Sequence, residues 1–337
     1  MIQKEQRRKD GKLDELARLC YNRSKGKKEV RKMSAVVVAT QMAIMFFFLF
    51  IGYGLTKRGH FSDQTSRDLS FIISNICCPS MLLAGIFSAP AMTGRELLEG
   101  GVATVVIYAI LIGVGLLVGP LLGIPKKERK FYQLMTVFSN VGFIGYPVIH
   151  AVIGPEGMAF AALFNLGFNL LIFTYGLALL RKGQMRVNWK TFLNAGTISG
   201  VLAILLLLTR PTVPTALVNC LSYMGNAMTF FATAIVGHSL AGTSLGVVLK
   251  QKRTYWFIAV RYLLVPILLG IGLKQLVSNE LLLNVFLLLL AMPAANMPLM
   301  MAQEYEMETE TLTGGIVLST LCSIVTITVV ATVVNLL

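Results

Sequence analysis

The sequence predicts an all-α integral membrane protein of about ten transmembrane helices, arranged as two inverted five-helix repeats. Three observations predict this fold: the composition, the recurrence of long apolar runs, and the similarity of the two halves. Of 337 residues, 55% are hydrophobic and only 14% are charged, whereas soluble globular chains carry about 25% charged residues. The chain is therefore too apolar for a soluble protein.

Apolar runs of about 20 residues, enough to cross the hydrocarbon of a bilayer, recur from residue 34 to the end. Lipid offers backbone groups no hydrogen-bond partners, so runs of this length are predicted to be helices. The alternation typical of barrel strands is absent. The predicted spans are 34–56, 67–90, 99–123, 130–151, 157–180, 192–209, 215–242, 255–274, 281–302 and 311–336.

The net charge of +14 lies mainly in a basic leader and in every second loop, such as 126–130 and 250–253. This distribution sets topology and does not indicate a nucleic-acid partner. It places the basic loops in the cytoplasm and the start of the first helix outside, which conflicts with the basic leader. We therefore assign 1–33 as a basic leader that is not native, and expect the true start at Met33, with Met1 to Lys32 as upstream sequence. The alternative is a native basic tail that is cytoplasmic or binds lipid, with the first helix inverted or the loop charges overruled.

The two halves, 34–182 and 183–337, resemble each other in their fourth helices. The first contains FSNVGFIGYPV and the second contains LAMPAANMPLM, so both carry Asn, Pro and small residues in mid-span. Because each half has an odd number of helices, the halves must insert with opposite orientations. Paired Gly/Pro-interrupted helices in inverted repeats are typical of the binding sites of secondary transporters.

The fourth helix is predicted to break between Ser139 and Pro147. Pro147 removes a backbone donor, while Gly142 and Gly145 permit unwinding and close approach. A break at membrane depth must be lined by protein or by a watery cavity. The N-terminus of a half-helix attracts a carboxylate, and Asn140 can bind beside it. The alternative is a proline kink that only serves packing.

The ninth helix repeats this pattern, with Pro293 and Pro298 on either side of Asn296. Two such breaks in equivalent helices favour a functional interpretation. We expect the two broken helices to cross at the centre of the bilayer and to bind substrate there.

Other polar residues lie within the spans. Asn75 could reach the crossing, or it could belong to a packed kink at Pro79. Arg261 could extend to the interface, pair structurally or attract an anion. Asn165 and Asn169, four residues apart, more often bridge helices than bind a ligand.

The middle of each predicted span lacks Asp and Glu, which argues against a carboxylate proton relay. No cluster with metal-ligand spacing and no intramembrane nucleophile with a base is visible, so we expect no cofactor, no metal and no enzyme activity.

These motifs resemble the auxin efflux carrier family, which includes malate and malonate permease-like proteins and is related to PIN-type carriers. The resemblance covers residues 34–337 and rests mainly on Asn140 to Pro147 and on PAAN at 293–296 followed by AQEY at 302–305. It implies a scaffold bundle, a transport bundle with elevator-like motion, and a carboxylate bound where the broken helices cross. The short link between the fifth and sixth helices differs from the long loop of the plant carriers.

The expected function is secondary transport of a small organic anion across the plasma membrane by alternating access. An anion channel and a transporter-like sensor are the alternatives. A proton or sodium ion as coupling ion and a homodimer both stay open.

Overall fold

The computed structural model describes residues 35–181, 193–243 and 245–336, and within these ranges the regular elements are all helices. The leader, 1–33, lies outside the described residues. The α-helices are α2 (Ala35–Lys57), α3 (Asp63–Ile72), α4 (Cys78–Ser88), α5 (Gly94–Leu121), α6 (Arg129–Val137), α7 (Tyr146–Val152), α8 (Met158–Leu171), α9 (Leu177–Leu180), α10 (Ala195–Thr209), α11 (Thr215–Gly242), α12 (Leu245–Val248), α13 (Lys252–Ile258), α14 (Val265–Leu276), α15 (Glu280–Ala291), α16 (Met297–Glu304) and α17 (Glu310–Leu336).

The predicted all-α membrane fold is confirmed. Seven helical stretches in the described ranges are long and apolar enough to cross a membrane: Val36–Lys57, Asp63–Ser88, Gly94–Leu121, Pro155–Leu180, Thr215–Gly242, Lys252–Leu276 and Glu310–Val333. The other three predicted spans correspond to the shorter apolar helices Val141–Val152, Ala195–Thr209 and Glu280–Ala291. Large apolar side chains such as Phe47, Val105 and Leu208 are 64, 70 and 60% exposed, as expected for contact with lipid.

The fourth and ninth spans are broken, as predicted. After α6 the chain is extended at Phe138 (φ −106°, ψ 94°), and helix resumes at Val141. After α15 it is extended at Met292 (φ −60°, ψ 145°), and α16 begins at Met297. The first break therefore lies just before the Gly and Pro residues that predicted it.

Pro147 itself lies within a continuous helix, because a π-helical turn, Val141–Gly145, directly precedes α7. The same arrangement places π-helical turns at Ile73–Cys77 before Pro79 and at Ala259–Leu264 before Pro266. A proline lacks the N–H of an ordinary helical bond and crowds the preceding turn, and a widened turn accommodates both effects. These helices continue through their prolines.

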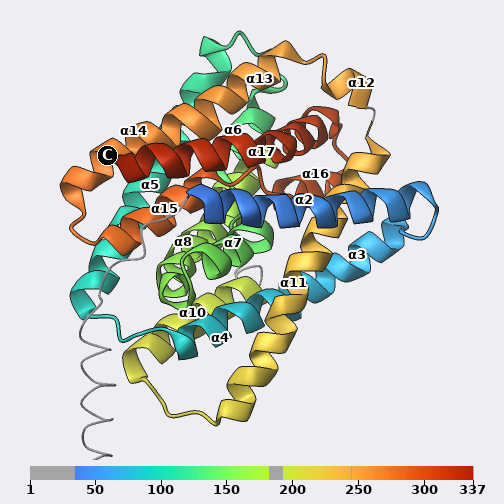
Figure 1. The fold of residues 1–337 in the computed structure, drawn as a ribbon. Helices are drawn as coiled ribbons and strands as arrows, with labels where there is room; N and C mark the ends of the chain where they lie inside the picture. The colour runs from blue at the N-terminus through green and yellow to red at the C-terminus, as the bar shows by residue number, and fades with distance from the viewer. Residues whose placement is uncertain (1–34, 182–192, 244, 337) are drawn as a thin grey trace, which may run out of the picture. The chain divides into compact units, whose positions relative to one another are not determined.

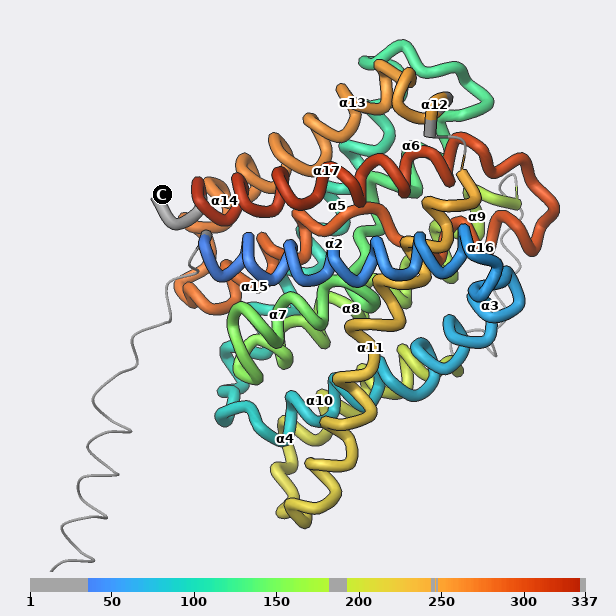
Figure 2. Tube along the Cα trace, turned by 45° about the vertical axis from the view of Figure 1, so that its right-hand side comes forward, coloured from blue at the N-terminus to red at the C-terminus, as the bar shows by residue number. Residues whose placement is uncertain are grey.

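Helix α11 packs on α2 and on α4, α4 packs on α10, and α11 crosses α2 closely (Figure 1). At this crossing Gly52 faces the backbone of Ala234, and Gly237 faces the backbone of Leu49 and Tyr53. Small residues are what allow membrane helices to approach this closely. In both views α4, α10 and the N-terminal part of α11 lie below α7 and α8, whereas α13, α14 and α17 lie above them (Figure 2).

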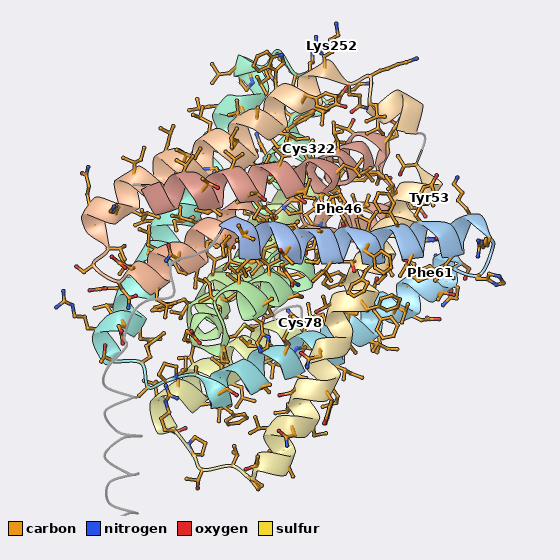
Figure 3. All side chains as sticks on the ribbon, in the orientation of Figure 1. Phe46, Tyr53, Phe61, Cys78, Lys252 and Cys322 are labelled. Atoms are coloured by element: carbon orange, nitrogen blue, oxygen red, sulfur yellow. The ribbon has the colours of Figure 1, made fainter. Side chains whose placement is uncertain are left out.

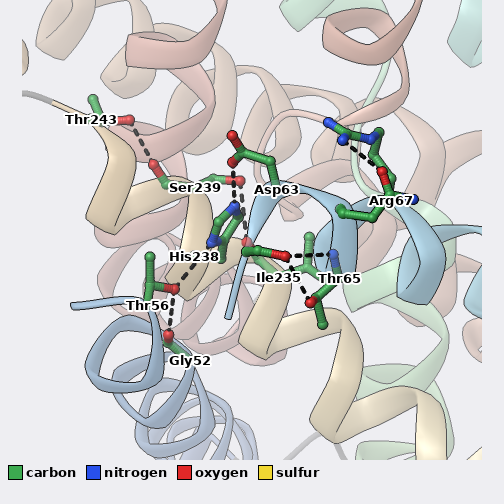
Figure 4. Close-up of polar contacts among 11 residues, drawn as sticks. Gly52, Thr56, Asp63, Thr65, Arg67, Ile235, His238, Ser239 and Thr243 are labelled. Carbon is green, nitrogen blue, oxygen red and sulfur yellow. Dashed lines mark hydrogen bonds and ion pairs between the residues drawn. The ribbon is translucent and has the colours of Figure 1, made fainter. Parts of the chain in front are cut away.

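His238 of α11 makes hydrogen bonds that join one end of α11 to α2 and to the start of α3 (Figure 4). Its Nδ1 lies 3.1 Å from Thr56 Oγ1 and its Nε2 lies 2.9 Å from Asp63 Oδ1. The Phe61 ring stacks beside the imidazole, with the ring centroids 5.1 Å apart. The turn between α2 and α3 is thereby tied to the C-terminal part of α11.

Candidate functional site

The two broken helices meet at their extended segments and pair through the main chain. Asn140 N donates to Pro293 O at 2.8 Å, and Ala295 N donates to Phe138 O at 2.9 Å, on either side of an antiparallel bridge between Ser139 and Ala294. Each break thus satisfies backbone groups that the other break leaves free. This exchange makes irregular backbone tolerable inside a membrane protein.

Neighbouring helices satisfy further polar groups of the crossing. The Ser319 hydroxyl of α17 accepts from Ala294 N at 3.2 Å, and the Tyr262 hydroxyl donates to Met135 O at 2.8 Å. Arg261, which is fully buried, donates to carbonyl oxygens near the ends of α6 and α15 and to Ser139 Oγ. The crossing is therefore held in one conformation from several sides.

A cavity of about 270 Å³ lies beside the crossing. Part of its lining comes from the π-helical turn between α3 and α4 and from the first residue of α4. The rest comes from both breaks and the helical turns that follow them, from α8 and from the start of α10. Cys78 of α4, labelled in Figure 3, is one of the lining residues. The lining includes six asparagines: Asn75, Asn140, Asn165, Asn169, Asn194 and Asn296.

Three helices begin at this cavity, and an asparagine stands at the start of each. Asn140 Oδ1 accepts from Phe143 N at 3.1 Å, and Asn194 Oδ1 accepts from Thr197 N at 2.9 Å. Asn296 precedes α16 without a side-chain capping bond. Each helix N-terminus carries roughly half a positive elementary charge, so the three together favour an anion in the cavity.

The described residues that line the cavity include no Asp, Glu, Lys, Arg or His. Polarity therefore comes from amides, from Ser74 and from backbone groups. An amide can donate to a carboxylate, and free helix N–H groups do the same. The arrangement suits a small anion recognised by hydrogen bonds and not by ion pairs.

The structure brings four of the predicted site residues together around the cavity: Asn75, Asn140, Gly142 and Asn296. Five others lie outside its lining: Gly145, Pro147, Pro293, Pro298 and Arg261. Gly145 packs against Leu289, and Pro298 lies in the first turn of α16. Of these five, Pro293 and Arg261 make hydrogen bonds within the crossing itself.

Sequence reasoning underrated Asn165 and Asn169 and missed Asn194. Both α8 asparagines are 5% exposed and line the cavity, and Asn169 Nδ2 also donates to Asn165 O at 2.9 Å. Asn194 stands directly before the apolar run of α10, which is a recognisable helix-start signal. That signal places the start of a helix but says nothing of the cavity beside it.

Comparison with known proteins agrees with this architecture. The sequence profile of the family described as "Membrane transport protein" matches the chain twice, over residues 37–187 and 180–331. A protein named as an uncharacterized transporter from Methanocaldococcus jannaschii is 26% identical over 300 residues, which is 84% of this chain and 94% of that protein. A second, from Methanothermobacter thermautotrophicus, is 24% identical over 147 residues, 42% of this chain and 46% of its own length. The double match to one profile fits two inverted repeats, and the chain therefore belongs to the membrane transport protein family, the auxin efflux carrier family that its helix-break motifs resemble.

Proposed function

We propose that this transporter carries a small organic anion with a carboxylate group, and that the anion binds in the asparagine-lined cavity at the crossing. The observation that carries this proposal is the lining itself: six amides and three helix N-termini without a charged side chain among the described residues. A cation would gain nothing from three positive helix ends. A cavity of about 270 Å³ suits a small solute.

The position of the cavity supports alternating access by an elevator-like movement. On one side it is lined by Ser74, Asn75 and Cys78, which belong to the span that packs with α11, and by the start of α10, which packs with α4 of that span and also with α8. On the other side it is lined by the two breaks and by α8. A substrate held by the crossing would cross the membrane if the second group slid against the first. We place this transport in the plasma membrane.

Labelled malate, malonate and indole-acetate, offered to proteoliposomes under imposed potential and ion gradients, test this function. Asn140→Ala and Asn296→Ala are each expected to lower saturable uptake about tenfold or more, because each removes a hydrogen bond to a charged substrate. Asn296→Asp, which is isosteric, is expected to lower uptake further, since it adds a negative charge beside the anion.

Asn226→Ala is the matched control, because Asn226 is an exposed amide of α11 outside the cavity lining. Its uptake should equal that of the wild type. Melting curves of each purified variant separate loss of binding from loss of folding. Saturable uptake that survives both alanine variants would remove the anion from this cavity. Uptake that never saturates would favour a channel, and uptake of none of the three anions would contradict the proposed substrate class.

A further inference from the structure

Arg261 binds the crossing of the two broken helices, but the proposed anion site gives its positive charge no role. It lies in the Lys252–Leu276 span, is 0% exposed and does not line the cavity. An ionised side chain in that position is costly and normally marks a function. Among the described residues no carboxylate is ion-paired with it.

The partners of Arg261 are neutral oxygens from both broken helices. Its Nε donates to Thr136 O, Nη1 donates to Leu290 O at 2.9 Å, and Nη2 donates to Ser139 Oγ at 2.8 Å. Thr136 and Leu290 are the next-to-last residues of α6 and α15, so one guanidinium binds the C-terminal ends of both half-helices. The two ends sit in equivalent helices of the two repeats.

The charges balance. Each helix C-terminus carries roughly half a negative elementary charge, so the two ends together supply about one negative charge. The single positive charge of the guanidinium matches this total. Unlike a lysine ammonium, its planar fork can reach three oxygens in fixed directions at once.

In coupled transporters, carbonyl oxygens at half-helix C-termini and unwound backbone coordinate the coupling cation. Here the equivalent oxygens are already bound by a side chain of the protein. We propose that Arg261 is a resident cation that takes the place of a coupling cation at the crossing. It is a positioning residue: through Ser139 it fixes Asn140, the next residue, without touching the substrate.

This inference rests on the proposed anion transport, and it adds a specific consequence. A site filled by a fixed cation neither needs nor accepts Na⁺. Wild-type uptake should therefore be unchanged when choline replaces Na⁺ on both sides of the membrane. Na⁺ should likewise leave the melting temperature of the wild-type protein unchanged at constant ionic strength.

Arg261→Ala empties the site. Its uptake is expected to fall roughly tenfold for each charged hydrogen bond lost. Millimolar guanidinium, well below denaturing concentrations, should raise both the melting temperature and the uptake of this variant, because a ligand that binds only the folded protein stabilises it. Na⁺ should give a smaller increase, and neither ion should affect the wild type.

Tyr262→Phe is the matched control. It removes a neutral hydroxyl that donates to Met135 O, close to the C-terminal end of α6 that Arg261 also binds. It should respond to neither cation. Arg261→Lys keeps the charge and is expected to fold and to show Na⁺-independent uptake. If Arg261→Ala does not fold, the lysine variant decides: uptake or a melting temperature that becomes dependent on Na⁺ contradicts the proposal.

The proposal is overturned if wild-type uptake requires Na⁺, or if neither cation raises the melting temperature of folded Arg261→Ala. The melting experiments involve no substrate. They therefore judge the resident cation even if none of the three anions is transported, whereas Na⁺-dependent wild-type uptake would overturn the resident cation and leave anion transport intact.

Discussion

Replacing Gly237 by alanine is expected to lower the free energy of unfolding by about 3 kcal/mol or more, the upper part of the range for overpacked cores. A Cβ atom at this position would lie 2.8 Å from Tyr53 N and closer still to Leu49 O. Both neighbours are backbone atoms of α2, so no side chain can rotate away. The helices must separate, and the whole α2–α11 contact loosens. The melting temperature of the purified protein measures the effect.

Gly54 provides the matched control on the same helix pair, because a Cβ there would meet nothing within 4 Å. Alanine is a better helix former than glycine by about 1 kcal/mol. Gly54→Ala should therefore leave the melting temperature unchanged or raise it slightly. Equal destabilisation by the two substitutions would show that α2 and α11 do not approach each other closely at Gly237.

Gly52, which lies on α2, tests the same contact between α2 and α11. Its added Cβ would lie 2.6 Å from Ala234 Cα. Once either substitution has pushed the helices apart, the second should cost much less, so the double variant is expected to be less destabilised than the sum of the single variants. Strict additivity would mean that the two glycines act at independent contacts.

Gly142→Leu is expected to reduce transport by about a hundredfold while the protein remains folded. Gly142 lines the cavity, and a Cβ there would meet only Cys78 Sγ, at an ordinary 3.7 Å. The backbone therefore accepts a side chain, and the isobutyl group would occupy the space that we propose for the anion. Loss of the anion contacts, at roughly 1.5–3 kcal/mol for each charged hydrogen bond, gives a reduction of this size when two contacts are lost.

Two alanine variants separate cavity filling from packing. Gly142→Ala fits the structure and should transport at nearly the wild-type rate. Gly145→Ala places a Cβ 2.8 Å from Leu289 Cδ2, outside the cavity lining, and should lower the melting temperature. Gly142→Leu with full activity would place the substrate path elsewhere.

The spans could be predicted from the sequence because they depend on a local property. A run of about 20 apolar residues must be helical in lipid, whatever its neighbours are. The two breaks were also predictable, since Pro293 and the Gly and Pro residues of the fourth helix limit the backbone directly. The predicted position of the first break lies a few residues after the observed one. The reason is that a π-helical turn, which depends on the surrounding helices, accommodates Pro147.

The site could be predicted only in part. Asn140 and Asn296 were identified because they lie within the breaks. Asn165 and Asn169 looked like a helix bridge, and Asn194 was not singled out within the predicted span 192–209. Their meeting at one cavity depends on how α8 and α10 pack against the crossing. Packing between distant segments leaves no periodic pattern in a single sequence.

The role of Arg261 depends most clearly on contacts between distant parts of the chain. A multi-pass helical protein with two equivalent broken helices follows from the amino-acid sequence alone, because hydrocarbon thickness and backbone chemistry act on neighbouring residues. Whether this arginine reached the interface, paired or faced the substrate could not be decided from its position in a span. Its oxygen partners lie 125, 122 and 29 residues away along the chain. Only the folding of the two repeats against each other brings the ends of α6 and α15 to one guanidinium, where a buried charge is stabilised by two helix dipoles.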